Sequence, residues 1–109
     1  MIQDTISQIE ARIGQSAVKD DSKTELLTLL GTLKSEVAEL SKTHDEQAQS
    51  IAGFTQVSAH EATREEPDPA LVKHSLDGLA ASVTGFEKSH PSLVSIVNRI
   101  CTTLSNLGI

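Results

Sequence analysis

The chain has 109 residues, of which 38% are apolar and 22% are charged, and it contains two phenylalanines but no tryptophan or tyrosine. A chain of this length forms one domain at most, and the surface that it can bury alone leaves a thin margin of stability. The net charge of −6 is uneven, since residues 1–70 carry thirteen acidic and six basic side chains whereas residues 71–109 carry two and three. Without a basic run or a set of aromatic side chains, nucleic-acid binding has little support.

Cysteine content and apolar run length indicate where the protein resides. Cys101 is the only cysteine, which excludes an internal disulfide and is typical of the reducing cytosol. No uncharged apolar stretch approaches the roughly 18 to 20 residues that span a bilayer, and residues 1–10 lack the basic start and apolar centre of a signal peptide. We therefore expect a cytoplasmic protein without a membrane partner.

The first predicted helix covers residues 2–13. Four isoleucines repeat there at spacings of four, three and four, which places them on one stripe of a helix: Ile2, Ile6, Ile9 and Ile13. Gly14 is expected to end this helix, and the polar residues 15–21 connect it to the next.

The second and longest predicted helix covers residues 22–50. Ser22 and Glu25 stand in the Ser-x-x-Glu arrangement, in which a hydroxyl and a carboxylate each satisfy a free backbone N–H at a helix start. Beyond them, steps of four and three define a heptad-like seam that turns polar in its lower half. The seam consists of Leu26, Leu30, Leu33, Val37, Leu40, His44, Gln47, Ile51, Phe54 and Ser58.

Compactness limits the length of this helix. An unbroken helix to Glu66 would measure about 67 Å at ~1.5 Å per residue, whereas a compact domain of this size has a radius of gyration of roughly 13 Å. Gly53 offers an exit from the helix, and the acidic residues 61–68 are followed by Pro69. We expect residues 51–68 to be less ordered than the rest.

The third predicted helix covers residues 69–88 and carries two adjacent stripes. One stripe is apolar, and the other contains only small residues: Ser75, Gly78, Ser82 and Gly85. Glycine costs a helix roughly 1 kcal/mol relative to alanine, so two glycines on one face predict the close approach of a neighbouring helix. The alternative is that they merely weaken this helix.

The fourth predicted helix covers residues 91–107 and follows a sharp turn at residues 89–91, because proline is favoured in the first turn of a helix. Its apolar residues occupy one continuous arc of roughly 160°: Leu93, Val94, Ile96, Val97, Ile100, Cys101, Leu104 and Leu107. We expect this helix to be a central part of the core, with Cys101 as a small core residue.

The turn and the last helix carry a family resemblance. The segment Phe86-Glu87-Lys88-Ser89-His90-Pro91-Ser92-Leu93, with Asn98-Arg99-Ile100 and the ending Leu107-Gly108-Ile109, resembles the small bacterial proteins grouped as domain of unknown function 4404. The likeness is best over Leu71–Ile109, is looser over residues 22–40 and leaves residues 43–69 uncovered. The resemblance implies a bacterial source and a helical protein, and it supplies no activity because none is established for the family.

Histidine patterns raise the question of a metal site. Glu87 and His90 have the Glu-x-x-His spacing of di-iron helical bundles, but a single pair is a weak signal and Pro91 follows at once. The alternative assigns His90 to capping the last helix and leaves Glu87 in solvent. His60 and Glu61 begin a zinc-peptidase pattern that fails because Arg64 stands where a second histidine is needed.

His44 lies at the centre of the long seam. The leading interpretation is a polar residue that sets register in a helical interface. A pH-responsive contact and a metal ligand are the alternatives.

Together these patterns predict an all-α, single-domain helical bundle over residues 1–109, with a long heptad-patterned second helix. The seam and the arc offer more apolar face than one thin chain covers, which favours a homo-oligomer, most simply a dimer, although a compact monomer is the alternative. The candidate interface is Leu26, Leu30, Leu33, Val37, Leu40 and His44, and the candidate turn or cap is Glu87, His90 and Pro91.

For function, the sequence predicts a non-enzymatic oligomeric or interaction protein, in the form of an adaptor that offers a helical groove to an unidentified protein partner. No cofactor, catalytic residue or nucleic-acid partner is predicted. The alternative is a metal-binding helical bundle that uses Glu87 and His90.

Overall fold

A computed structural model of the protein describes residues 2–108 and contains five α-helices and no strand within that range. The helices are α1 (Ile2–Gln15), α2 (Asp20–Ser41), α3 (Asp45–Ala62), α4 (Pro69–Ser82) and α5 (Pro91–Gly108). The predicted all-α helical bundle is therefore confirmed.

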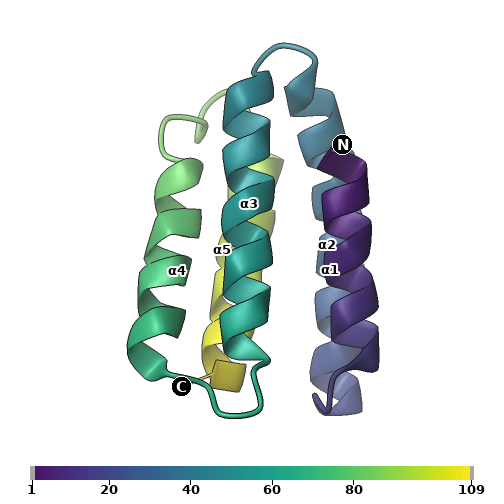
Figure 1. The fold of residues 1–109 in the computed structure, drawn as a ribbon. Coiled ribbons are helices and arrows are strands. Elements are labelled where there is room, and N and C mark those ends of the chain that lie inside the picture. The colour runs from purple at the N-terminus through teal and green to yellow at the C-terminus, as the bar shows by residue number, and fades with distance from the viewer. Residues whose placement is uncertain (1, 109) are drawn as a thin grey trace.

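Successive helices run in opposite directions, so the connections alternate between the two ends of the bundle (Figure 1). α3 stands at the centre of the view, with α1 and α2 on one side, α4 on the other and α5 behind it. α1 packs against α2 and α3, whereas α4 packs against α3 and α5. The α2–α3 turn and the α4–α5 loop consequently lie at the same end of the bundle.

The core of the bundle is aliphatic and is filled by all five helices. The Cα radius of gyration is 12.7 Å and the molecule measures 37 × 24 × 21 Å, as expected for a compact chain of this size. The largest fully buried side chains are Ile6, Ile13, Leu26, Leu30, Leu33, Val37, Leu40, Ile51, Leu79, Leu93, Ile100 and Leu104.

The prediction of one helix over residues 22–50 is wrong. α2 ends at Ser41, and the turn at residues 42–44 sends α3 back alongside it. This bend lets the aliphatic half of the seam pack inside the same chain, where α2 contacts α1, α3 and α5. The expected weak order over residues 51–68 is also wrong for most of that segment, because α3 continues through Gly53 to Ala62.

Helix ends also differ from the predictions in detail. α2 begins at Asp20, and its N-cap Lys19 makes no side-chain cap hydrogen bond, so the Ser22 arrangement does not start the helix. α4 ends at Ser82 rather than at residue 88, because the loop that follows contains Gly85 with a φ of 99°, a conformation that favours glycine. α1 and α5 begin where the pattern predicts and extend slightly further.

The predicted stripe of small residues meets a close neighbour only at Gly78, because Gly85 lies in the loop that follows α4. Ser75 is buried, and a Cβ atom built on Gly78 would collide with the ring of Phe54, which projects from α3. The close approach is made by an aromatic side chain rather than by the backbone of a helix. Gly78 is therefore needed to seat Phe54.

Candidate functional site

The predicted interface residues do not form a surface. Five of them lie on α2 and are at most 1% exposed, packed inside the core of the same chain: Leu26, Leu30, Leu33, Val37 and Leu40. Helices α1, α3 and α5 of the same chain cover them, so the apolar surplus that motivated an interface along this seam is absent. His44 departs from the other five because it is exposed and precedes α3.

The second predicted group forms the loop between α4 and α5. The Gly85 N–H donates to Glu87 Oε2 over 2.7 Å, and the His90 N–H donates to the Phe86 carbonyl over 2.8 Å. The Val94 N–H in turn donates to the His90 carbonyl, and Pro91 is the first residue of α5. Glu87, His90 and Pro91 thus close the loop and start the last helix.

The fold brings His44 to this same loop, a contact that the sequence did not predict. The ring centroids of His44 and Phe86 are 5.5 Å apart, those of Phe86 and His90 5.4 Å, and those of His44 and His90 6.2 Å, all in edge-to-face arrangements. Such ring pairs add stability beyond the area that they bury. The cluster therefore fastens the α2–α3 turn to the α4–α5 loop.

The arrangement of these side chains gives metal binding no support. His44 Nδ1 lies 2.8 Å from the Thr43 hydroxyl, and His90 Nδ1 lies 2.9 Å from the Ser89 hydroxyl. Across residues 2–108 no group of three or more His, Cys, Asp or Glu side chains is gathered as a metal site would require. Glu87 accepts a backbone N–H instead of joining the histidines.

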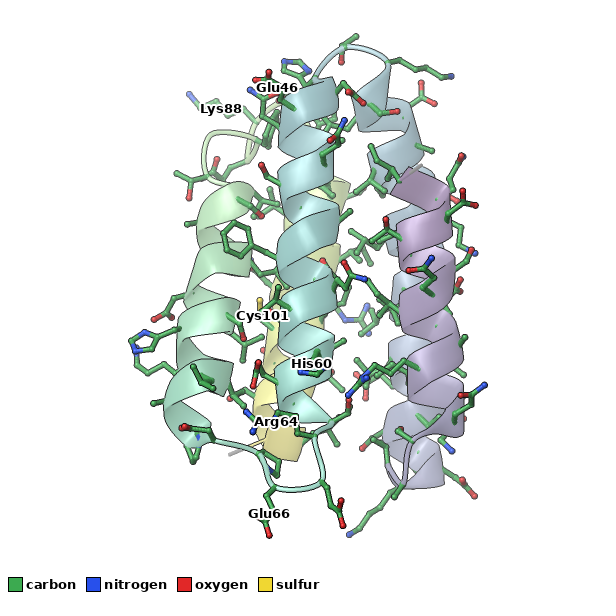
Figure 2. The ribbon with its side chains drawn as sticks, viewed as in Figure 1. Glu46, His60, Arg64, Glu66, Lys88 and Cys101 are labelled. Atoms are coloured by element: carbon green, nitrogen blue, oxygen red, sulfur yellow. The ribbon has the colours of Figure 1, made fainter. Side chains whose placement is uncertain are left out.

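The histidine of the failed zinc pattern lies on α3, towards the end of the bundle opposite Glu46 and Lys88 (Figure 2). Arg64 Nη1 donates to Glu61 Oε1 over 2.9 Å, and this hydrogen bond, with the charge of Glu61, raises the pKa of Arg64. His60 Nε2 lies 3.9 Å from Glu61 Oε2. Arg64 therefore pairs with Glu61 rather than with His60, and Arg64 and Glu61 form a surface ion pair.

Cys101 is half-buried between α5 and α4, with Sγ 3.9 Å from the Leu76 carbonyl oxygen (Figure 2). Burial, followed by the negative charge of Asp77, raises the pKa of the thiol from 9.0 to about 11. Because the thiolate is the reactive form, Cys101 is a poor nucleophile at neutral pH.

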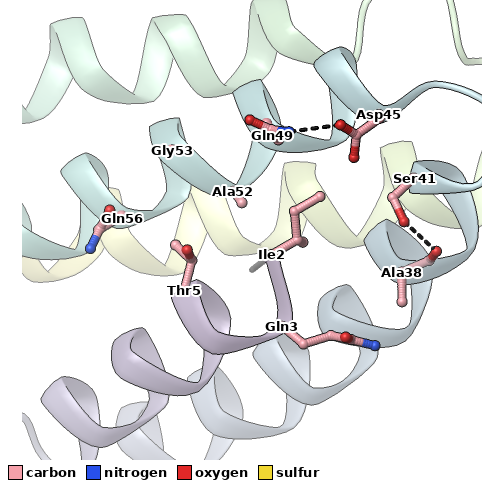
Figure 3. A pocket seen from close by; sticks show the side chains of 10 residues that line it. All are labelled: Ile2, Gln3, Thr5, Ala38, Ser41, Asp45, Gln49, Ala52, Gly53 and Gln56. Atoms are coloured by element: carbon pink, nitrogen blue, oxygen red, sulfur yellow. Dashed lines mark hydrogen bonds between the residues drawn. The ribbon is translucent and has the colours of Figure 1, made fainter.

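A series of hollows follows the line where α1 meets α3. The upper part is a cavity of about 620 Å³ that reaches down to Ala38 and Ser41 of α2 (Figure 3). A cavity of about 400 Å³ adjoins it at Gln56, and a third of about 470 Å³ shares Gln8 and Arg12 with the second. We call these adjoining cavities together the α1–α3 groove.

Small and polar side chains line the upper part of the groove, whereas Arg12, His60 and Glu61 line the lower part. On the α3 wall Ala52 and Gly53 leave space, and a Cβ atom on Gly53 would meet nothing within 4 Å. Asp45 accepts a hydrogen bond of 2.7 Å from Gln49 Nε2 at the upper end. Lower down, Val57 is 48% exposed, which makes it one of the few large apolar side chains open to solvent.

Arg12 bridges the lower end of the groove. Its Nε donates to Thr63 Oγ1 over 3.1 Å, which joins α1 to the residue that follows α3. Glu10 and Lys34 form an ion pair between α1 and α2. These polar links help to hold α1 in place besides its buried isoleucines.

Two of these features were not predicted from the sequence. The polar α1–α3 groove escaped prediction because it depends on how two helices pack, although the polar positions 5, 8 and 12 between the isoleucines were visible in the sequence. The ring cluster escaped because His44 is more than forty residues from Phe86 and His90. The Phe-Glu-x-x-His-Pro motif was the one visible signal for it.

No helix within residues 2–108 is long and apolar enough to span a bilayer. No curated protein and no solved structure matches this chain. The model of a family described as a domain of unknown function, DUF4404, matches residues 26–109, including the middle segment that the resemblance left uncovered and excluding α1. The chain therefore belongs to the DUF4404 family.

Proposed function

We propose that the protein is a non-enzymatic interaction protein of the cytoplasm, and that it holds a segment of a partner protein in the α1–α3 groove. The cytoplasmic location rests on the single cysteine, which fits a reducing compartment. The binding role rests on the groove, which runs along α1 and takes contributions from α2 and α3.

One observation carries this proposal: Val57 stands 48% exposed at the wall of the groove. Ile9, which is 2% exposed, lies in the same part of the groove. Covering apolar surface is favourable by about 25 cal/mol per Å². A partner that sets an apolar side chain against Val57 gains that free energy, whereas the aliphatic core of the bundle is closed to it.

The polar lining suits a polypeptide ligand. The side-chain amides of Gln3, Gln8 and Gln56 make no hydrogen bond with any residue in the described range. Each amide offers two donors and one acceptor. These groups can pair with the backbone or polar side chains of a segment whose apolar residue contacts Val57.

Capture of partners from the native host with single-residue variants tests the proposal. Val57→Glu places a charge in the groove and is expected to abolish capture of the protein that the unaltered chain retains. Leu71→Glu is the matched control, because Leu71 is 43% exposed and lies on α4, outside the groove. Both variants should remain folded by circular dichroism. If the Val57→Glu variant retains the same partner, or if Leu71→Glu loses it equally, the groove is not the binding site.

A further inference from the structure

We propose that the α2–α3 turn is a hinge, and that two copies of the chain exchange their α1–α2 segments when it straightens. In the exchanged dimer, α2 and α3 form one helix over residues 20–62. α1 and α2 of each copy then pack on α3, α4 and α5 of the other. Each α1–α3 groove is built from both copies.

The turn is close to helical already. The His44 N–H donates to the Leu40 carbonyl over 2.8 Å, and the Ala48 N–H donates to the His44 carbonyl over 2.9 Å. Both are the bonds between residues four apart that a continuous helix makes. Lys42 has helical dihedral angles, with φ −67° and ψ −27°, whereas His44 has φ −138° and ψ 62°. Rotation about very few bonds therefore separates the two forms.

This turn also lacks the residues that enforce the later turns of the chain. The α3–α4 loop contains two prolines and Asp68, whose carboxylate accepts the Ala70 N–H at the start of α4. The α4–α5 loop contains Gly85 at positive φ and ends at Pro91. The α2–α3 turn has neither glycine nor proline, and the α3 N-cap His44 makes no side-chain cap hydrogen bond. No glycine, proline or capping side chain therefore opposes a straight helix. The contacts that hold the turn closed are the His44 ring contacts with Phe86 and His90, which must be released when the turn straightens.

The buried residues on either side of the turn keep one helical phase. Steps of three or four connect the buried positions of α2 to those of α3 through His44, so that all of them would share one stripe if the turn were straight. They are Leu26, Leu30, Leu33, Val37 and Leu40 before the turn, and Ala48, Ile51, Thr55, Ser58 and Ala62 after it.

The exchange conserves the core. The contacts of α1 with α3, and of α2 with α3 and α5, pass between copies, while those of α1 with α2, and of α4 with α3 and α5, remain within one copy. Two identical copies can therefore fill each other's cores with the same pairs of packed helices, as in other exchanged dimers. Packing of the α1–α2 segment within its own chain competes with exchange, at an effective concentration on the order of 1 mM. The dimer should therefore become a major species near that protein concentration.

A proline at the hinge distinguishes the exchanged dimer from a dimer of closed chains that associate through their surfaces. Asp45 is the first residue of α3, where proline is favoured, and Asp45→Pro should leave the closed monomer folded. In a helix over residues 20–62 the same proline lies in the interior, where it should raise the dissociation constant about 100-fold or more. Asp45→Ala is the control, because it loses the same side-chain bond to Gln49 without breaking a helix.

The measurement is light scattering after refolding at about 1 mM, the effective concentration named above, with circular dichroism to confirm folding. We expect dimer for the unaltered chain and for Asp45→Ala, and monomer for Asp45→Pro. A monomeric unaltered chain under these conditions overturns the proposal, and so does an Asp45→Pro dimer.

Chemical cross-linking of chains whose hinge sequence is unaltered gives an independent test. It does not depend on how the proline variant folds. In a Cys101→Ser background, cysteines replace Arg12 and Thr63, which join α1 to the end of α3, or Glu10 and Lys34, which join α1 to α2. A short bis-maleimide should link the first pair between chains in the refolded dimer and the second pair within a chain. Intrachain links for both pairs in a dimer would rule out the exchange, whatever surface holds that dimer together.

Discussion

The contact between Phe54 and Gly78 predicts that Gly78→Ala changes the free energy of unfolding differently in the presence and in the absence of the Phe54 ring. Without a neighbouring side chain, Gly78→Ala should stabilise the helix by about 1 kcal/mol, because alanine is the better helix former. In the folded chain the new Cβ atom collides with the Phe54 ring, which is 42% exposed and must swing further into solvent. Full burial of a phenylalanine contributes about 1.5 to 3 kcal/mol, so loss of the buried part costs about 1 to 1.5 kcal/mol. The two effects nearly cancel in Gly78→Ala alone.

In a Phe54→Ala background the collision is absent, and Gly78→Ala should raise the free energy of unfolding by about 1 kcal/mol. The coupling between the two substitutions is then about 1 to 1.5 kcal/mol, which urea denaturation followed by circular dichroism resolves. Equal effects of Gly78→Ala in the two backgrounds would refute the packing of Phe54 over Gly78.

Three further predictions address the core and Cys101. Ile100→Ala should lower the free energy of unfolding by about 2 to 5 kcal/mol, because Ile100 is fully buried. Ser95→Ala, on the exposed side of the same helix, is the control and should change the free energy of unfolding little. An equally small loss for Ile100→Ala would place Ile100 at the surface. Leu33→Asp should unfold the chain, since it buries an unpaired carboxylate inside one molecule; a folded variant by circular dichroism would contradict that burial. The neutral Cys101 thiol stabilises the fold below pH 9.0, and this contribution should disappear as the pH rises to about 11, because the unfolded thiol ionises first. Denaturation midpoints compared with those of Cys101→Ser measure that loss, and a constant difference would contradict the raised pKa.

Apolar periodicity predicted α1 and α5 well because each helix has one face to bury. The isoleucines at positions 6, 9 and 13 are buried, as are Leu93, Val97, Ile100 and Leu104 of the predicted arc. The remaining members of the arc are partly buried against the same core. A single apolar stripe flanked by polar residues has one stable orientation, so local sequence is enough to place it.

The break at residues 42–44 was not predictable from the local sequence. Periodicity records which side of a helix is apolar, and the stripe stays in phase from Leu40 through His44 to Ala48. The bend is set by compactness, because a straight helix would expose the aliphatic seam of a chain that folds alone. A compact chain must bend somewhere, and the bend was predicted near Gly53, which α3 accommodates within the helix. The cluster of His44, Phe86 and His90 exists only because the bend comes where it does.

The central structural claim is that α2 and α3 lie side by side in one chain, and a distance between spin labels tests it most directly. Cysteines at Thr28 and Gln56 in a Cys101→Ser background place one label on each helix, at similar distances from the turn. Neighbouring helices have axes about 8 to 10 Å apart, so in dilute monomer the labels should lie within about 20 Å of each other. A single distance near 42 Å, the length of 28 residues at ~1.5 Å each, would show an unbroken helix in the monomer and contradict the fold.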